Sequence, residues 1–448
     1  MKRSAWRYLW TAGDIRNRLL ITLGLLILYR LAAHVPVPGV NRAAVAQILA
    51  SGAGGGATQL VSLLDLLSGG TVSTFSVLAM GVYPYITAQI ILQLLVPIIP
   101  RLQKIMEDDP RQGREFMERW TYYLAVPMAA LNAFGQIRLM LSLQGQGATT
   151  SILTFGNDIG FNLPTITMIV TMTGGTLFAI WLGELISEYG IRNQGLSLII
   201  FAGIVSRIPS NLLTILSDQQ NRVRSLFFFI VIVVLTVIVI VFVQQGRRNV
   251  PVMYPGRRMG NRQSMPVRGN LPLQVNMAGM IPVIFAQSIL TFPAIIAQFF
   301  IASSNVTVKN ISISIQNLFG GTSNWYWLLF FVMVVAFTFF YTDVVFSQQN
   351  YGENLKRVGA QVPGVTKGAP TQRYLMKVLR RITLPGAVFL GIVAVIPFLV
   401  RPLIPTATAN FSILSTGLLI VVGVVRDTFF GLDAELKLRG YDDTLLVR

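Results

Sequence analysis

The sequence predicts an all-α integral membrane protein with ten membrane-spanning helices. Of its 448 residues, 53% are hydrophobic and only 12% are charged, whereas soluble proteins average about 25% charged residues. The mean hydropathy is +0.61, and many apolar runs reach the roughly 20 residues that a bilayer-spanning helix needs. This composition excludes a set of water-soluble domains.

The ten expected spans follow one another along the chain with few charged residues inside them. The sixth is the clearest, because it is an almost unbroken run of Phe, Ile, Val and Leu. The fifth is the weakest, because Arg207 and Pro209 interrupt it. The spans lie at about 19–35, 74–97, 120–140, 163–186, 195–217, 225–245, 275–300, 325–347, 382–401 and 411–430.

Lys and Arg gather in alternate loops, and this pattern predicts the orientation. The chain has 36 Lys and Arg against 18 Asp and Glu, and cytoplasmic loops of membrane proteins carry the excess of Lys and Arg. Here the basic residues concentrate before the first span, after the second, sixth and eighth spans and in the C-terminal tail, whereas the loop after the fourth span carries only Arg192. Both termini are therefore expected in the cytoplasm, which agrees with an even number of spans.

The spans divide into an N-terminal half, 1–222, and a C-terminal half, 223–448, with five spans each. An odd number of spans makes the second half enter the membrane from the side opposite to the first. If the halves are structural repeats they are inverted, an arrangement that places the functional site at the interface between them.

Three segments outside the spans have two interpretations each. The basic loops at about 246–274 and 348–381 either only enforce the topology or dock a polyanion through clustered Arg. The apolar stretch at about 60–73 is either a re-entrant half-helix surrounded by protein or a small amphipathic helix on the external surface. Within spans, Arg30 and Arg207 are interpreted as side chains that extend to the membrane interface.

Residue counts argue against an enzyme. The chain has no cysteine and a single histidine, His34, so it lacks thiol chemistry and multi-His metal sites, and a membrane-embedded hydrolase is disfavoured. It has no G-x-x-x-x-G-K-[ST] motif, so any ATP-driven work needs another protein. A secondary transporter for small solutes remains an alternative, disfavoured because no acidic residue is expected near the membrane centre.

Motifs distributed along the chain carry a resemblance to a known family. The longest reads Leu-Ala-Met-Gly-Val-Tyr-Pro-Tyr-Ile at 78–86, and Ser-Gly-Gly at 68–70 precedes it. The other motifs lie at 28–31, 36–39, 93–95, 181–184, 190–191, 201–205, 271–282, 354–356 and 362–364. From about Arg18 to Tyr441 the sequence resembles the SecY/Sec61α family, the main channel subunits of the Sec protein translocase.

The resemblance implies a fold in which two inverted five-helix halves form a clamshell with a central pore and a plug. The plug corresponds to about 60–73, where the matched residues are Leu64, Leu67, Ser68, Gly69 and Gly70. The pore ring falls at Val82, Ile86, Leu196, Ile200, Ile284 and Ile420. All six ring residues are aliphatic, and such a collar dewets and resists ion leakage.

The resemblance also implies a lateral gate between the second and seventh spans. Polar residues of these spans are Thr87, Gln93, Asn276, Gln287 and Ser288. Hydrogen bonds across this seam are expected to hold the gate shut at about 0.6 to 2 kcal/mol each, with Gln93 and Asn276 the first candidates.

The resemblance implies two partners for the basic loops, the ribosome and the SecA ATPase. The docking residues are Arg247, Arg248, Arg257, Arg258, Lys356, Arg357 and Lys367. Lys367 stands where the family usually has an Arg, and an ammonium lacks the guanidinium fork. The stretch 190–195 is one residue longer than in the family, which leaves the register of Leu196 and Ile200 open by one position.

The function that the resemblance implies is a passive protein-conducting channel without cofactors. It would translocate unfolded secretory polypeptides across the bacterial plasma membrane and release membrane segments laterally into the lipid bilayer. Small SecE and SecG subunits are expected to clasp it, signal sequences and nascent polypeptides to pass through it, and SecA or the ribosome to drive it.

Overall fold

The computed structural model is predominantly helical, and each of the ten expected spans overlaps a helix. It describes residues 13–438 apart from 46–60, 145–161, 401–407 and shorter stretches within 42–43, 62–74, 97–109, 193–266, 301–304 and 321–322. The matching helices are α2 (Gly13–Ala32), α5 (Tyr83–Leu95), α7 (Pro110–Gln144), α8 (Leu163–Tyr189), α9 (Gly195–Ser217), α10 (Arg222–Gln245), α11 (Ile281–Phe300), α13 (Asn324–Gln348), α15 (Ala369–Val400) and α16 (Thr408–Leu438).

Length and composition alone single out three stretches of the described residues as able to cross a membrane. They are Leu163–Tyr189, Asn324–Arg357 and Ala369–Ile396, with mean hydropathies of 1.6, 2.2 and 1.8. Shorter apolar helices lie at Gly195–Pro209, Phe229–Gln245 and Ile281–Ala297.

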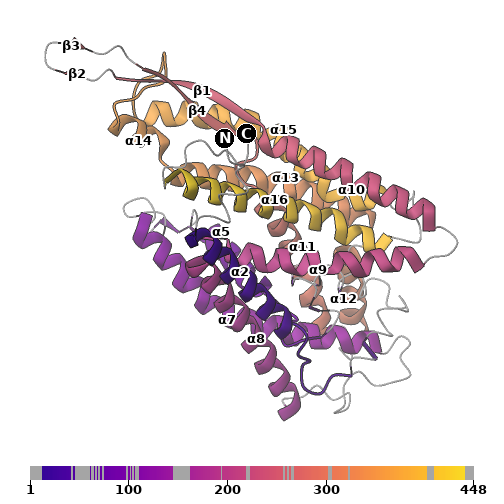
Figure 1. The fold of residues 1–448 in the computed structure, drawn as a ribbon. Helices are drawn as coiled ribbons and strands as arrows, with labels where there is room; N and C mark the ends of the chain where they lie inside the picture. The colour runs from indigo at the N-terminus through magenta and orange to yellow at the C-terminus, as the bar shows by residue number, and fades with distance from the viewer. Residues whose placement is uncertain are drawn as a thin grey trace.

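Helices from the two ends of the chain form two groups (Figure 1). Helices α2, α5, α7 and α8 pack on one another on one side, and α10, α13, α15 and α16 on the other. Helix α9 contacts α2 and α8 as well as α10 and α16, and α11 contacts α5 and α7 as well as α13 and α15. These two helices therefore join the groups.

The expected starts of two spans, 74 and 275, are wrong because a glycine interrupts the helical path at each. Helix α5 begins only at Tyr83 and α11 only at Ile281. Gly81 has φ +51° and Gly279 has φ +64°, a left-handed conformation that glycine adopts without steric cost. A Cβ at Gly81 would also lie 2.5 Å from the carbonyl oxygen of Ser68, so this turn packs tightly against the candidate plug.

The two basic loops contain regular secondary structure that was not predicted from the sequence. Residues 246–274 form an antiparallel hairpin of β1 (Arg247–Tyr254) and β4 (Val267–Gln274), with β2 (Arg258–Met259) and β3 (Arg262–Gln263) towards its tip. Val250 and Val252 alternate with exposed residues and face inwards, as a half-buried strand requires. The other loop contains α14 (Tyr351–Arg357) and the first turns of α15. One further helix, α12 (Val306–Phe319), precedes α13.

Two apolar clusters organise the interior. The central cluster brings together buried residues of both helix groups, among them Tyr29, Val82, Ile200, Ile284 and Ile420. The hairpin cluster joins β1, β4, α14 and the start of α15. Its buried residues are Val250, Val252, Leu273, Phe346, Leu355, Ala360, Val362, Leu375 and Leu379.

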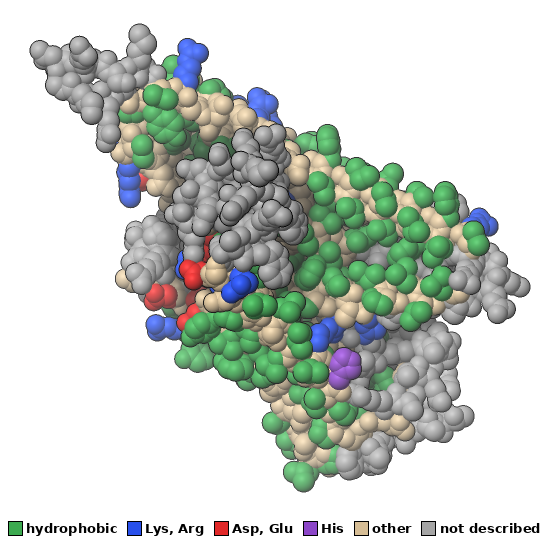
Figure 2. All heavy atoms as spheres, viewed as in Figure 1, with side chains coloured by type: hydrophobic (Ala, Val, Ile, Leu, Met, Phe, Trp, Pro, Cys, Tyr) green, Lys and Arg blue, Asp and Glu red, His purple; other side chains and the backbone are tan. Residues whose placement is uncertain are grey.

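The outer faces of several helices are apolar and exposed. On α10, Phe227, Leu235, Ile238 and Phe242 are each at least 60% exposed, and Figure 2 shows apolar side chains spread over this part of the surface. An exposed apolar face of this extent marks contact with lipid or another protein. For an entire helix of membrane-spanning length, hydrocarbon is the natural surrounding.

Candidate functional site

All six residues of the expected pore ring lie in or against the central cluster. Five are buried, none more than 9% exposed, and Leu196 is half-buried and packs against them. They come from both helix groups: Val82 and Ile86 at the start of α5, Leu196 and Ile200 on α9, Ile284 on α11 and Ile420 on α16. The arrangement joins aliphatic side chains from distant parts of the chain, and a pore role for them remains a prediction.

The start of α9 is held in register by close packing on α8. A Cβ at Gly195 would collide with the carbonyl oxygen of Gly183, and a Cβ at Gly183 would lie 2.8 Å from Leu196 Cδ2. Leu196 therefore lies against α8, whereas Ile200 is 5% exposed in the central cluster.

The candidate plug segment is buried wherever the structure describes it. Val61, Asp65 and Ser68 are 1%, 5% and 3% exposed, which favours the re-entrant interpretation over a helix on the external surface. The predicted plug residues Leu64, Leu67, Gly69 and Gly70 lie outside the described residues.

The segment is held by an ion pair and by hydrogen bonds, and we call this set of contacts the plug seat. Arg207 of α9 places Nη2 2.8 Å from Asp65 Oδ2 and 3.1 Å from Oδ1. Tyr29 of α2, which is fully buried, donates its hydroxyl to the carbonyl oxygen of Ser68 at 3.3 Å. The hydroxyl of Thr71 shares its single proton between the same carbonyl oxygen, at 3.2 Å, and that of Leu78 beyond the segment, at 2.6 Å.

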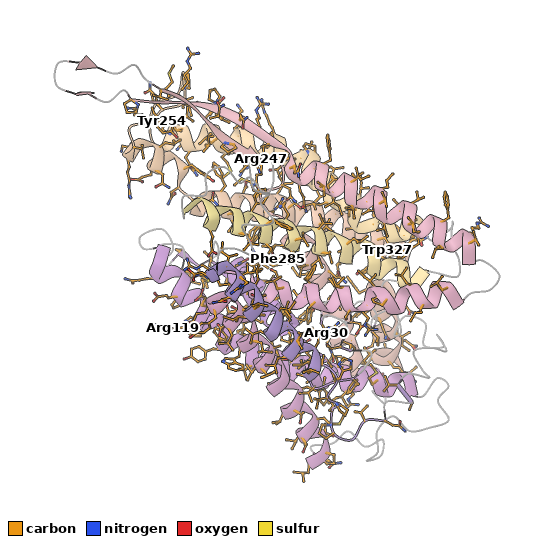
Figure 3. All side chains as sticks on the ribbon, in the orientation of Figure 1. Arg30, Arg119, Arg247, Tyr254, Phe285 and Trp327 are labelled. Carbon is orange, nitrogen blue, oxygen red and sulfur yellow. The ribbon has the colours of Figure 1, made fainter. Side chains whose placement is uncertain are left out.

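A second arginine lies beside this ion pair. Arg30 donates from Nη2 to the carbonyl oxygen of Gly203 on α9 at 3.1 Å, and it interacts electrostatically with both Arg207 and Asp65. Figure 3 shows Arg30 on α2 where that helix approaches α9. Arg207 was interpreted as a side chain that extends to the membrane interface, and the structure adds that its guanidinium pairs with a buried carboxylate.

Four of the five polar residues of the expected lateral gate are buried, Gln93 is half-buried, and the two hydroxyl side chains bond within their own helices. Thr87 donates to Pro84 on α5 at 2.9 Å, and Ser288 donates to Ile284 on α11 at 2.8 Å. Asn276 donates to Gly279 and leaves its Oδ1 without a partner. Among the described residues, no hydrogen bond joins the side chains of Thr87, Gln93, Asn276, Gln287 and Ser288 to one another.

Unsatisfied polar atoms nevertheless gather near this seam. The Oε1 of Gln93 and the hydroxyl of Tyr83 are buried without partners, and the Tyr83 phenol lies near Ser288 of α11 without reaching hydrogen-bond geometry. Gln287 is 2% exposed. Buried polar groups almost always have hydrogen-bond partners, so these exceptions mark the seam as unusual, and its role as a gate remains a prediction.

The hairpin of β1 and β4 and residues 351–367, which include α14, form one unit because backbone hydrogen bonds join them directly, and we call it the hairpin unit. The backbone groups of Met253 in β1 and Gln361 after α14 exchange hydrogen bonds of 2.8 and 2.9 Å. Above the hairpin cluster, the surface exposes Arg248, Lys356, Arg357 and Lys367. The hairpin projects from one end of the molecule (Figure 1).

The predicted docking residues are not equivalent. Arg247 is exposed at the base of the hairpin (Figure 3), and its guanidinium carbon lies 5.4 Å from the ring centre of Phe430 on α16. It therefore stabilises the hairpin base as well. Arg257 and the side chain of Arg258 lie outside the described residues.

Comparisons with known proteins identify the family. The family model described as SecY matches residues 76–429. The chain belongs to the SecY family. Family members named protein translocase subunit SecY are 38% identical in Mycobacterium bovis, over 442 residues, and 37% identical in Streptomyces griseus, over 440 residues. In both cases the match covers 96% of this chain and 97% of the relative.

Solved structures show that the fold is that of the SecY family. A structure described as a protein conducting channel matches with a TM-score of 0.61 and 16% identity, and one of a SecY protein with its plug domain with 0.62 and 16%. Both matches cover 96% of this chain and 95% of the other. Sec61 from a canine ribosome-channel complex has a TM-score of 0.58. The chain is accordingly a multi-pass membrane protein of this fold, as the resemblance implied.

Sequence reasoning missed the residues of the plug seat. Asp65 was visible as a single acid within the apolar stretch Leu-Leu-Asp-Leu-Leu, and a charge in such a setting requires a partner. The sequence offered several cations as that partner, and only the fold selects Arg207.

Proposed function

We propose that this protein is the main channel subunit of a bacterial protein translocase, a passive pore for unfolded secretory polypeptides. The observation that carries the proposal is the aliphatic set Val82, Ile86, Leu196, Ile200, Ile284 and Ile420, which the fold assembles from both helix groups. Aliphatic side chains offer no oxygen ligands to an ion, and a constriction of this kind excludes water when closed. The same side chains yield to a moving chain of any sequence, because they make no specific bonds with it.

The plug seat and the seam complete the channel. The segment around Asp65 blocks the pore at rest and is held there by Arg207 and Tyr29. The seam between α5 and α11 opens laterally to lipid, because its buried polar side chains do not bond across it. A hydrophobic signal segment that enters the seam replaces the weak contacts between α5 and α11. Membrane segments then leave the channel through the open seam into the bilayer.

The driving force comes from outside the chain, which has no P-loop motif. The exposed cations of the hairpin unit, such as Arg248, Arg357 and Lys367, suit the phosphates of ribosomal RNA and acidic surfaces of the SecA ATPase. Small SecE and SecG subunits clasp the helix groups. The likeness to Sec61 in a ribosome-channel complex supports the ribosome as a partner.

The protein resides in the bacterial plasma membrane with both termini in the cytoplasm. Its relatives named protein translocase subunit SecY come from bacteria. The Lys and Arg residues of the hairpin unit and of the chain ends lie on the side that the distribution of positive charge assigns to the cytoplasm.

Disulfide crosslinking tests the channel directly, because the chain has no cysteine of its own. Ile86→Cys and Ile284→Cys are reconstituted separately with a stalled secretory polypeptide that carries one cysteine. Both variants are expected to form a disulfide with the polypeptide, and only when its signal sequence is present. Ile238→Cys, which is 62% exposed on the outer face of α10, is the matched control and should remain unlinked.

Two outcomes would contradict the proposal. If the stalled chain binds but Ile86→Cys and Ile284→Cys link no more than Ile238→Cys, the pore does not pass through this cluster. If the chain does not bind and the purified protein takes up small solutes, the secondary-transporter alternative is correct.

A further inference from the structure

A pocket of about 850 Å³ opens between α13 and α15, next to α14 and the hairpin unit. Four cations of α15 line it, namely Arg373, Lys377, Arg380 and Arg381. Their spacing places them along one side of the helix, because residues three and four apart are neighbours on a helix surface. We call this site the basic pocket.

The basic pocket contains more positive charge than its own carboxylate balances. Asp343 of α13 takes a bidentate pair with Arg380, at 2.7 Å to Nη2 and 3.2 Å to Nε. Among the described residues, no carboxylate lies within ion-pair distance of Arg373, Lys377 or Arg381, and all three side chains are exposed. These three positive charges are available to an anion from outside the chain.

Part of the pocket lining is apolar. Phe339 on α13 and Met376 and Leu384 on α15 line it, and Leu384 is 57% exposed. From Arg373 to Leu384 the helix advances by roughly 16 Å. The pocket therefore combines cationic side chains with apolar ones at its Leu384 end, as the bilayer combines headgroups with acyl chains.

Position along the chain places this transition at the membrane surface. The eighth span was expected to end near 347 and the ninth to begin near 382, and the cations lie just before the second of these points. Basic pockets between membrane helices at this depth bind phosphate headgroups of lipids.

We propose that the basic pocket binds an anionic phospholipid from the leaflet on the hairpin side. The headgroup phosphate is held by Arg373, Lys377 and Arg381, and an acyl chain lies against Phe339 and Leu384. This combination distinguishes a lipid from a soluble anion or a nucleic acid, neither of which uses the apolar wall.

The bound lipid has a route to the hairpin unit. Gln372, which lines the pocket, accepts a hydrogen bond from Gly352 N of α14 at 2.8 Å and donates to the carbonyl oxygen of Phe346 on α13 at 3.4 Å. A lipid that holds α13 and α15 together therefore also stabilises the position of α14.

Photo-crosslinking in nanodiscs tests the proposal with the full-length chain. The bilayer is phosphatidylcholine with a minor fraction of a lipid that carries a diazirine on its acyl chain. This labelled lipid is either phosphatidylglycerol or phosphatidylcholine. Chymotryptic peptides that contain Leu384 are then quantified. Phosphatidylglycerol is expected to label them roughly tenfold more than phosphatidylcholine, because each nearby cation favours an anionic headgroup.

Three variants separate the site from general surface charge. The triple variant Arg373→Gln, Lys377→Gln, Arg381→Gln should reduce phosphatidylglycerol labelling to the phosphatidylcholine level. The control Arg248→Gln, Arg268→Gln, Arg357→Gln loses the same charge from the hairpin unit and should keep the labelling within about twofold. Arg373→Lys with Arg381→Lys keeps the charge and should also retain the labelling. This result would show that the two positions tolerate substitution and that the labelling depends on their charge.

Several results would overturn the proposal. Equal labelling by the two lipids, or an unchanged triple variant, would show that the pocket does not select an anionic lipid. Equal losses in the triple variant and the control would show only general attraction. Displacement of the label by soluble glycerol phosphate or by RNA would show that the natural occupant is a soluble anion or a nucleic acid.

Discussion

The plug seat and the basic pocket use charge in opposite ways. In the plug seat, the side chain of Asp65 is 7% exposed and pairs with Arg207 from a distant helix. In the basic pocket, the side chain of Asp343 is 33% exposed, and it pairs with one of several cations on the neighbouring helix. A closed ion pair fixes a segment of the chain, whereas an excess of one sign recruits a ligand of the other.

Burial makes the two ion pairs differ in energy. Removing one partner from a buried pair leaves an uncompensated charge and costs about 3 to 5 kcal/mol, whereas exposed pairs contribute about 0 to 1 kcal/mol. Arg207 is partly exposed, with 28% of its side chain accessible, so its pair is expected between these limits. The same Asp→Asn substitution at the two sites tests the comparison.

The largest effect is expected for Asp65→Asn. With the ion pair lost, the segment leaves its seat more often, and a Ser68→Cys reporter, buried in the parent chain, becomes accessible. The rate of its reaction with a membrane-impermeant maleimide is expected to rise roughly 10- to 100-fold, since each 1.4 kcal/mol corresponds to a factor of ten. Asp343→Asn in the same reporter chain is the control and should leave the rate unchanged. Equal rates in both variants would show that the ion pair does not hold the segment.

A smaller effect is expected at the turn that packs on Ser68. Gly81→Ala and Gly279→Ala both place alanine at a positive φ, but only at Gly81 does a Cβ meet a backbone oxygen, whereas Gly279 has open space. Gly81→Ala is therefore expected to destabilise the protein by roughly 2 kcal/mol more than Gly279→Ala, measured by thermal unfolding in detergent. It should also raise the reactivity of the Ser68→Cys reporter. Equal destabilisation by the two substitutions would mean that the backbone at Ser68 moves to accommodate the added Cβ at Gly81.

The smallest effect on stability is expected for Asp343→Asn. The exposed pair with Arg380 contributes at most about 1 kcal/mol, so the unfolding temperature should hardly move. Phosphatidylglycerol labelling at Leu384 should instead rise about two- to fivefold, because the pocket gains one net positive charge. Asp65→Asn should leave that labelling unchanged. A fall in labelling with Asp343→Asn would show that the carboxylate positions Arg380 for the lipid and does not compete with it.

The spans were predictable because a membrane imposes a local rule of length and hydropathy. The rule held for α8 and α10, whose bounds differ little from the expected ones. It failed at the starts of α5 and α11, because Gly81 and Gly279 break the helix inside runs that are still apolar. It also failed at α15, whose first turns are amphipathic and bury Leu375 and Leu379 in the hairpin cluster.

The candidate site was predictable only in part. The family motifs placed the aliphatic residues, and the structure gathers them in one cluster. The expected hydrogen bonds between α5 and α11 did not follow, because Thr87 and Ser288 bond within their own helices. A polar side chain in a span requires a hydrogen-bond partner, and the backbone carbonyl one turn earlier in the same helix is the nearest acceptor.

The sequence by itself determined that the chain is a membrane protein, the approximate position of its spans, which loops carry the positive charge and that the expected collar is aliphatic. These properties depend on composition and on short-range order along the chain. Only the tertiary structure decided that Arg207 pairs with Asp65, 142 residues away, and that α13 and α15 enclose a basic pocket. Long-range pairs have no local signal, because the sequence around an arginine in a span is the same whether its guanidinium contacts a carboxylate or water.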